Sequence, residues 1–243
     1  MNKILLVETK LFLRDPLAGA LALLLPVGLL LGIGQIPDLR KPDPAFGGER
    51  FVDAQLPATM ILLALLTSAF TILPNALATY REHGVLRRMS TTPVHPARLL
   101  AAQLVLNLVV AALGALLIVV AAALVFGSRL PGNLAGFVLV FLLGAAALLA
   151  LGLIIASVAN AKAAPAIGSV SMFPLLFLAG MWIPREVMPD ALRTVSDYSV
   201  VGPFIAALRA TWAGDWPELS HLAVLAAGLA VFCALAVRLF RWQ

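Results

Sequence analysis

Six long apolar stretches, separated by short polar segments, run along the chain. A helix needs about 20 apolar residues to cross the roughly 30 Å hydrocarbon core of a bilayer, and each stretch meets that length. None carries a charged residue near its middle, where one charge costs about 2.5–3.5 kcal/mol on insertion scales. The pattern predicts an all-α membrane protein with six transmembrane helices, at roughly residues 17–36, 56–79, 98–126, 133–159, 163–183 and 219–238.

The composition leaves little room for anything besides these spans. Of the 243 residues, 62% are hydrophobic, whereas soluble domains are about 45–50% apolar. The longest polar gap, about 184–218, is too short for a separate soluble domain, so we expect residues 1–243 to form one transmembrane domain. The net charge of +5 does not indicate nucleic-acid binding, because the basic residues sit at the ends of the spans rather than in a block with aromatics.

The basic residues also predict the orientation of the chain, because cytoplasmic loops carry an excess of Lys and Arg. With a cytoplasmic N-terminus, ten basic residues fall on the inner side and seven on the outer side. Six spans then place the C-terminus in the cytoplasm as well. The inner ten are Lys3, Lys10, Arg14, Arg81, Arg87, Arg88, Arg98, Lys162, Arg238 and Arg241, and the outer seven are Arg40, Lys41, Arg50, Arg129, Arg185, Arg193 and Arg209.

The polar segments between the spans differ in character. Residues 1–15 mix apolar and charged positions, which favours an interfacial helix on the inner leaflet. Residues 36–55 are rich in Pro, Gly and charge, so an irregular outer loop is expected. Residues 184–218 hold four prolines and apolar runs too short to span. We expect short interfacial or re-entrant helices there, shielded by protein or water.

The inner loop, residues 80–97, carries the most informative motif, YREHGVLRRMSTTPVHPA. It predicts a short docking helix that Arg81 and Glu82 begin, that Leu86 and Met89 give an apolar edge, and that Pro93 and Pro96 end. A helix held near the membrane by two spans would exchange force with a soluble partner. The alternative is a basic segment that only anchors the neighbouring spans on the cytoplasmic side.

This loop resembles that of the permease subunits of type-2 ATP-binding-cassette exporters. Their second and third spans are joined by a stretch like Arg-Glu-x-Gly-Thr-Leu-Arg-Arg, followed by a Thr-Pro turn. Val85 stands in place of the usual Thr, and the segments Leu11–Pro16 and Leu178–Arg209 look like other parts of the family's pattern. The matching loop positions are Arg81, Glu82, Gly84, Leu86, Arg87, Arg88, Thr92 and Pro93.

The resemblance implies that the chain is half of a transporter. A second permease copy, identical or a paralogue, would pair with it, and a cytoplasmic ATP-binding-cassette ATPase would dock on its inner face. The chain has no Gly-x-x-x-x-Gly-Lys-Ser/Thr loop, so we expect no cofactor in this chain and Mg-ATP on the partner ATPase. By resemblance, the ATPase-coupling residues are Arg81, Glu82, Gly84, Leu86, Arg87, Arg88 and Pro93.

The resemblance also places spans 2 and 5 beside a central path for cargo. Met and Phe side chains give an adaptable apolar surface, which suits a hydrophobic or amphipathic cargo that is drug-like or lipid-like. For each such residue the alternative is ordinary packing between helices. The candidate path residues are Thr67, Phe70, Asn75, Met172, Phe173, Phe177 and Met181.

Catalytic or metal-binding chemistry is not indicated. His83 and His95 lie in the inner loop while His221 begins span 6 on the outer side, so no pair meets across the membrane. No span contains a carboxylate, and no His, Cys, Asp and Glu cluster has metal spacing. The family resemblance implies a lipid-embedded permease of a bacterial cytoplasmic membrane, driven by a separate ATPase, that exports its substrate or flips it between leaflets. The runner-up is a non-transporting membrane scaffold that anchors a cytoplasmic partner.

Overall fold

The computed structural model describes residues 9–10, 16–43, 48–85, 96–158, 163–181 and 188–239. Over these ranges the chain is mostly helical, and its β-type pairing is limited to an isolated bridge between Pro42 and Arg50. The all-α prediction is confirmed. The helices are α2 (Pro16–Ile33), η1 (Pro37–Arg40), α3 (Gln55–Thr67), η3 (Ser68–Ile72), α4 (Leu73–Glu82), α6 (Pro96–Phe126), α7 (Leu134–Val158), α8 (Ala164–Leu178), α9 (Asp190–Tyr198), α10 (Val201–Ala213) and α11 (Leu219–Leu239).

Four helical stretches of the described chain are long and apolar enough to cross a membrane, and they coincide with predicted spans 2, 3, 4 and 6. α2 and α8 occupy the places of predicted spans 1 and 5, but their apolar stretches, Leu23–Ile33 and Ala166–Leu178, are shorter. α8 has 15 residues, which is about 22 Å of helix at 1.5 Å per residue. The count of six spans therefore stays a prediction. The four long stretches are Gln55–Glu82, Arg98–Phe126, Leu134–Ser157 and Leu219–Leu239.

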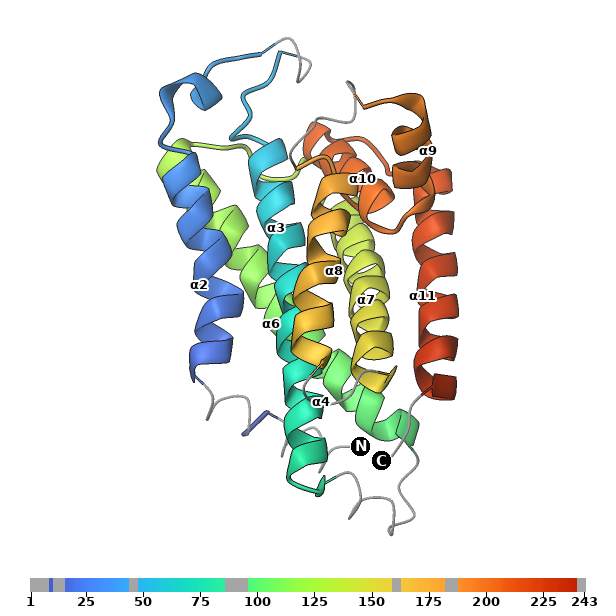
Figure 1. Cartoon of the computed structure of the whole chain (residues 1–243). Coiled ribbons are helices and arrows are strands. Elements are labelled where there is room, and N and C mark those ends of the chain that lie inside the picture. Colours follow the sequence, from blue (N-terminus) through green and yellow to red (C-terminus); the bar gives the residue numbers. More distant parts are fainter. Residues whose placement is uncertain are drawn as a thin grey trace.

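The long helices run side by side in one bundle (Figure 1). α4 continues α3 through η3 and projects from one end, where α7 and α11 also finish and α8 starts. We call this the inner end, following the charge count. α9, α10 and the turn between α6 and α7 lie at the opposite, outer end. The two helix ends that flank the inner loop are thus separated by the whole bundle from the helices that follow α8, as the predicted topology requires.

α3 lies at the centre of this bundle. Every one of its residues is buried, from Gln55 to Thr67, because α2, α6, α7, α8 and α10 all contact it. A helix that is apolar on all sides is expected to be surrounded in this way. α11 is the opposite case, since Leu225 and Ala236 are its only buried residues. Most of the α11 surface is therefore available to lipid.

In the described residues between α8 and α11 there are two short helices, as predicted, and both are tied to the bundle. The Oγ of Ser196 in α9 donates to the carbonyl oxygen of Leu178 at 2.6 Å, which holds α9 at the end of α8. In α10, the indole Nε1 of Trp212 donates to the carbonyl oxygen of Arg129 at 3.1 Å, and its ring meets Phe137 edge-on. α10 is mostly buried against α7, α11 and α3, so it lies within the bundle rather than on its surface.

In its described residues the outer loop is largely irregular, as predicted, and it is attached to the turn after α6. Arg50 forms an ion pair with Asp53 at 2.6 Å, and this hydrogen-bonded carboxylate raises the pKa of Arg50. The Oγ of Ser128 donates to the carbonyl oxygen of Val52 at 2.8 Å, which closes the attachment. The predicted interfacial helix over residues 1–15 lies outside the described residues, apart from Thr9 and Lys10.

Candidate functional site at the inner end of α4

Arg81 joins α4 to the end of α7. Its Nη1 donates to the carbonyl oxygen of Ala156 at 2.6 Å, and its Nη2 donates to that of Ser157 at 3.1 Å. These carbonyls belong to the last turn of α7, where intrahelical donors run out and the negative end of the helix dipole lies. Arg81 therefore caps α7 from a neighbouring helix, and its guanidinium points into the bundle rather than toward a soluble partner.

The residues around Arg81 face outward. Glu82 and His83 are exposed, and they continue an exposed polar face of α4 that begins at Asn75 and Thr79. Gly84 follows with a φ of 65°, in the left-handed region that commonly ends a helix. Helix runs without interruption from α3 through η3 to Glu82. The Arg-Glu pair thus ends the membrane helix, which corrects the expectation that it begins a separate docking helix.

The remaining coupling residues fall outside the described part of the chain. The structure gives the two flanks of the loop, where α4 ends at Glu82 and α6 begins at Pro96. The described half of the motif divides into an inward-facing Arg81 and an outward-facing Glu82. The docking role of the whole motif stays a prediction, including that of the four residues not described: Leu86, Arg87, Arg88 and Pro93.

The candidate path residues fall into two groups. Thr67 and Phe70 are buried inside the single chain, where Phe70 is 1% exposed and the Oγ1 of Thr67 donates to the carbonyl oxygen of Leu63 at 2.8 Å. The other residues reach the surface of the chain, and Phe173 is the most open of the large ones at 60% exposure. Asn75 is also exposed, and the half-buried members are Met172, Phe177 and Met181.

Predicted spans 2 and 5 meet through their backbones at η3, a contact that was not predicted from the sequence. η3 is a π-helical turn between α3 and α4. A Cβ atom on Gly168 of α8 would collide with the carbonyl oxygen of Phe70, and one on Gly152 of α7 would collide with that of Ala69. Small residues permit this close approach of helices. Because π-turns are rare and often occur at functional positions, η3 is a candidate pivot.

The sequence did contain a signal for this contact, namely glycines inside apolar helices. The signal is ambiguous, because Gly28 and Gly32 in α2 look the same in sequence. An added Cβ at either of those two positions would meet nothing within 4 Å. The Gly28-x-x-x-Gly32 spacing therefore marks no close helix contact within the described part of this chain.

Comparison with known proteins shows which family the chain belongs to. Residues 4–212 match the family described as "ABC-2 type transporter". The chain belongs to the ABC-2 type transporter family. It is a multi-pass transport permease, the membrane component of an ABC transporter, and membership of the family implies an ATPase partner. The family resemblance seen in the sequence is confirmed.

One relative covers the ABC-2 permease from end to end. It is a Bacillus subtilis (strain 168) protein named "Putative transport permease YvfS", 24% identical over 246 residues, which include 100% of this chain and 98% of the relative. No solved structure matches the chain. In the described part of the permease, no group of three or more His, Cys, Asp and Glu side chains is placed to hold a metal ion.

Proposed function

We propose that this ABC-2 permease is one half of an ATP-driven exporter in a bacterial cytoplasmic membrane. Two permease chains, identical or paralogous, pair in the membrane, and an ATPase subunit docks on the inner end of each. The cargo is a hydrophobic or amphipathic molecule that leaves the cytoplasm or the inner leaflet. The observation that carries this proposal is the family match across residues 4–212.

The inner end of α4 supports a coupling role. Glu82 is exposed at the last turn of α4, while Arg81 beside it is bound to the end of α7. A force applied by a docked ATPase near Glu82 would therefore reach two membrane helices at once. α7 contacts both α10 and α11, so the same displacement would be passed toward the outer end of the bundle.

The exposed face of α8 supports an apolar cargo. Ile167, Val170 and Phe173 are 45%, 69% and 60% exposed, and their spacing of three places them along one side of the helix. No Lys, Arg, Asp or Glu lies within α8. A face of this kind offers contact area without a charge to be paired, which suits a molecule transferred from lipid.

The test is ATP-dependent movement of a probe. Inside-out membrane vesicles that contain the permease and its ATPase partner would be given ATP and an amphipathic fluorescent dye, with an ATPase lacking the P-loop lysine as the control. We expect dye uptake that needs both ATP and the intact ATPase. A complex that hydrolyses ATP but moves neither dyes nor fluorescent lipids would favour the scaffold function instead.

A further inference from the structure

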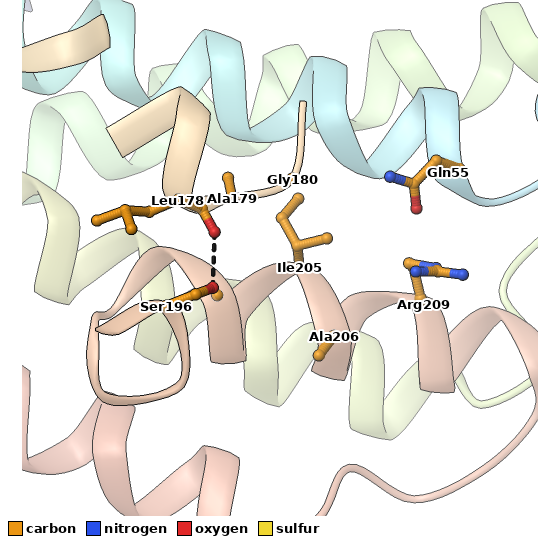
Figure 2. Close-up of a pocket in the computed structure, with 9 residues that line it drawn as sticks. Gln55, Leu178, Ala179, Gly180, Ser196, Ile205, Ala206 and Arg209 are labelled. Atoms are coloured by element: carbon orange, nitrogen blue, oxygen red, sulfur yellow. Dashed lines mark hydrogen bonds between the residues drawn. The ribbon is translucent and has the colours of Figure 1, made fainter. Parts of the chain in front are cut away.

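At the outer end, a cleft opens between four helices (Figure 2). Gln55, the first residue of α3, faces it from one side, and Arg209 of α10 faces Gln55 from the other. Apart from Ser196 of α9, the rest of the wall is apolar or glycine, and it includes Leu178 at the end of α8 and Ile205 of α10. The cleft is distant from the inner end of α4, where the proposed coupling residues lie, since α3, η3 and α4 separate the two sites.

Gln55 is the unusual member of this cleft. Its side chain is 7% exposed, and its Oε1 is buried without a hydrogen-bond partner. It does not cap α3, since no side-chain cap bond is made at that helix start. A buried polar atom without a partner costs free energy, so natural proteins rarely keep one without a reason. The amide oxygen of Gln55 is therefore set to receive a hydrogen bond from something that enters the cleft.

The neighbouring polar groups define what would enter. The hydroxyl hydrogen of Ser196 is already used, because the Oγ donates to the carbonyl oxygen of Leu178 at 2.6 Å. Arg209 contributes a guanidinium, which has five N–H donors and no acceptor. A group between Gln55 and Arg209 must donate to an amide oxygen and accept from a guanidinium. A hydroxyl does both, whereas a phosphate or carboxylate oxygen cannot donate and an ammonium cannot accept.

The size of the cleft limits the group to one or two atoms. Its cavity volume is about 20 Å³, close to the space that a single water molecule needs. One hydroxyl fits, with its carbon skeleton outside against Leu178, Ala179 and Ile205. This wall is apolar, so it suits the base of a head group rather than a free polar solute.

We propose that this cleft is a binding subsite for a neutral, hydroxyl-bearing head group of an amphipathic molecule, with Gln55 as acceptor and Arg209 as donor. The proposal rests on the proposed function and deepens it. It names hydroxylated amphiphiles as members of the cargo class and places a binding site for them near the outer end of the bundle. Binding is measured on the permease without ATP, so a failed transport assay and a failed binding assay have separate meanings.

The experiment uses the full chain in nanodiscs of phosphatidylcholine, which has no head-group hydroxyl. A neutral glucosyl-diacylglycerol is titrated in, and its binding is followed by native mass spectrometry. We expect Gln55→Met to weaken glycolipid binding about tenfold, the size of one hydrogen bond to a well-placed donor. Gln35→Met is the matched control, since Gln35 lies in the outer segment away from the cleft and accepts from Arg40 at 2.6 Å; it should leave binding unchanged.

Two further measurements separate binding from folding and lipid from free sugar. Because Oε1 of Gln55 has no partner, Gln55→Met should not lower the melting temperature of the unliganded permease, and a lower one would contradict the unpaired state. Free glucose should show no saturation at millimolar concentrations, and saturation that depends on Gln55 would contradict an amphipathic ligand. Equal glycolipid binding by the wild type and Gln55→Met, as expected if the cleft holds only water, would overturn the proposal.

Discussion

Gly168 of α8 lies against the backbone carbonyl oxygen of Phe70 in η3, so close that one added methyl group would collide with it. Gly152 of α7 makes the same kind of contact with the carbonyl oxygen of Ala69. Two helices thus meet consecutive peptide groups of one π-helical turn through backbone rather than through side chains. We infer that this joint would transmit movement between α4, whose last residues Arg81 and Glu82 begin the predicted coupling motif, and α8.

The joint predicts a sharp effect of a small substitution. Gly168→Ala places a methyl group on a backbone oxygen that cannot rotate away, so it should destabilise the permease by about 1–3 kcal/mol. Gly28→Ala is the matched control, because nothing lies within 4 Å of the added carbon and alanine favours the helix by about 1 kcal/mol. Thermal unfolding in detergent measures both, and equal melting temperatures for the two variants would contradict the joint.

Arg81 and Glu82 should respond differently to mutation although they are neighbours. Arg81→Met removes both donors from the last carbonyls of α7, and hydrogen bonds to a charged group are worth about 1.5–3 kcal/mol. We expect a lower melting temperature for Arg81→Met and an unchanged one for Glu82→Gln, whose side chain is exposed. Glu82→Gln should instead reduce co-purification of the ATPase. A reversed pattern would show that the inward and outward roles are misassigned.

Mutation of the two phenylalanines proposed for the cargo path should have different effects on stability and on transport. Phe70 is 1% exposed, so Phe70→Ala should cost about 3–5 kcal/mol of stability through the cavity it leaves. Phe173 is 60% exposed, so Phe173→Ala should leave stability nearly unchanged while altering which dyes are exported. Leu124→Ala, at an 81% exposed position of α6, is the control. If it shifts dye selectivity as much as Phe173→Ala, the assigned path is wrong.

The membrane orientation predicts labelling from opposite sides. Val85 and Thr194 are both exposed, at the inner and outer ends respectively. Single cysteines there, in a Cys233→Ala background, should react with an impermeant maleimide from the cytoplasmic face at position 85 and from the outer face at position 194. Ser196 is a poor reporter because it is 1% exposed and bonded to Leu178. Labelling of both positions from one face would refute the topology.

The apolar pattern of the sequence was sufficient to locate the long helices. Predicted spans 98–126, 133–159 and 219–238 correspond to Pro96–Phe126, Leu134–Val158 and Leu219–Leu239, within a few residues. The reason is physical, since the bilayer demands a continuous apolar run and charges mark its ends. The prediction of where the second span ends was less accurate. Arg81 and Glu82 read as loop residues, yet they remain helical because Arg81 finds acceptors on α7.

The facing of the helices could not be predicted in the same way. When all sides of a helix are apolar, periodicity no longer tells which side is buried. Nothing in the sequence therefore distinguished Phe70, which is enclosed by the bundle, from Phe173, which lies on its surface. Gln55 was equally hard to identify, because it stands just before the predicted second span and its burial depends on how α10 folds back into the bundle.

The most direct test of the account is the number of cargo molecules moved per ATP hydrolysed. It would be measured in proteoliposomes that contain the purified permease and ATPase, for the wild type and for the Glu82→Ala/Arg87→Glu double variant. We predict ATP-dependent transport by the wild type. The double variant should insert normally but lose most of its transport per ATP, because its contacts with the ATPase are weakened. Full coupled transport by the double variant would contradict the coupling role of the inner loop, and absence of transport by an ATP-hydrolysing wild-type complex would contradict the exporter itself.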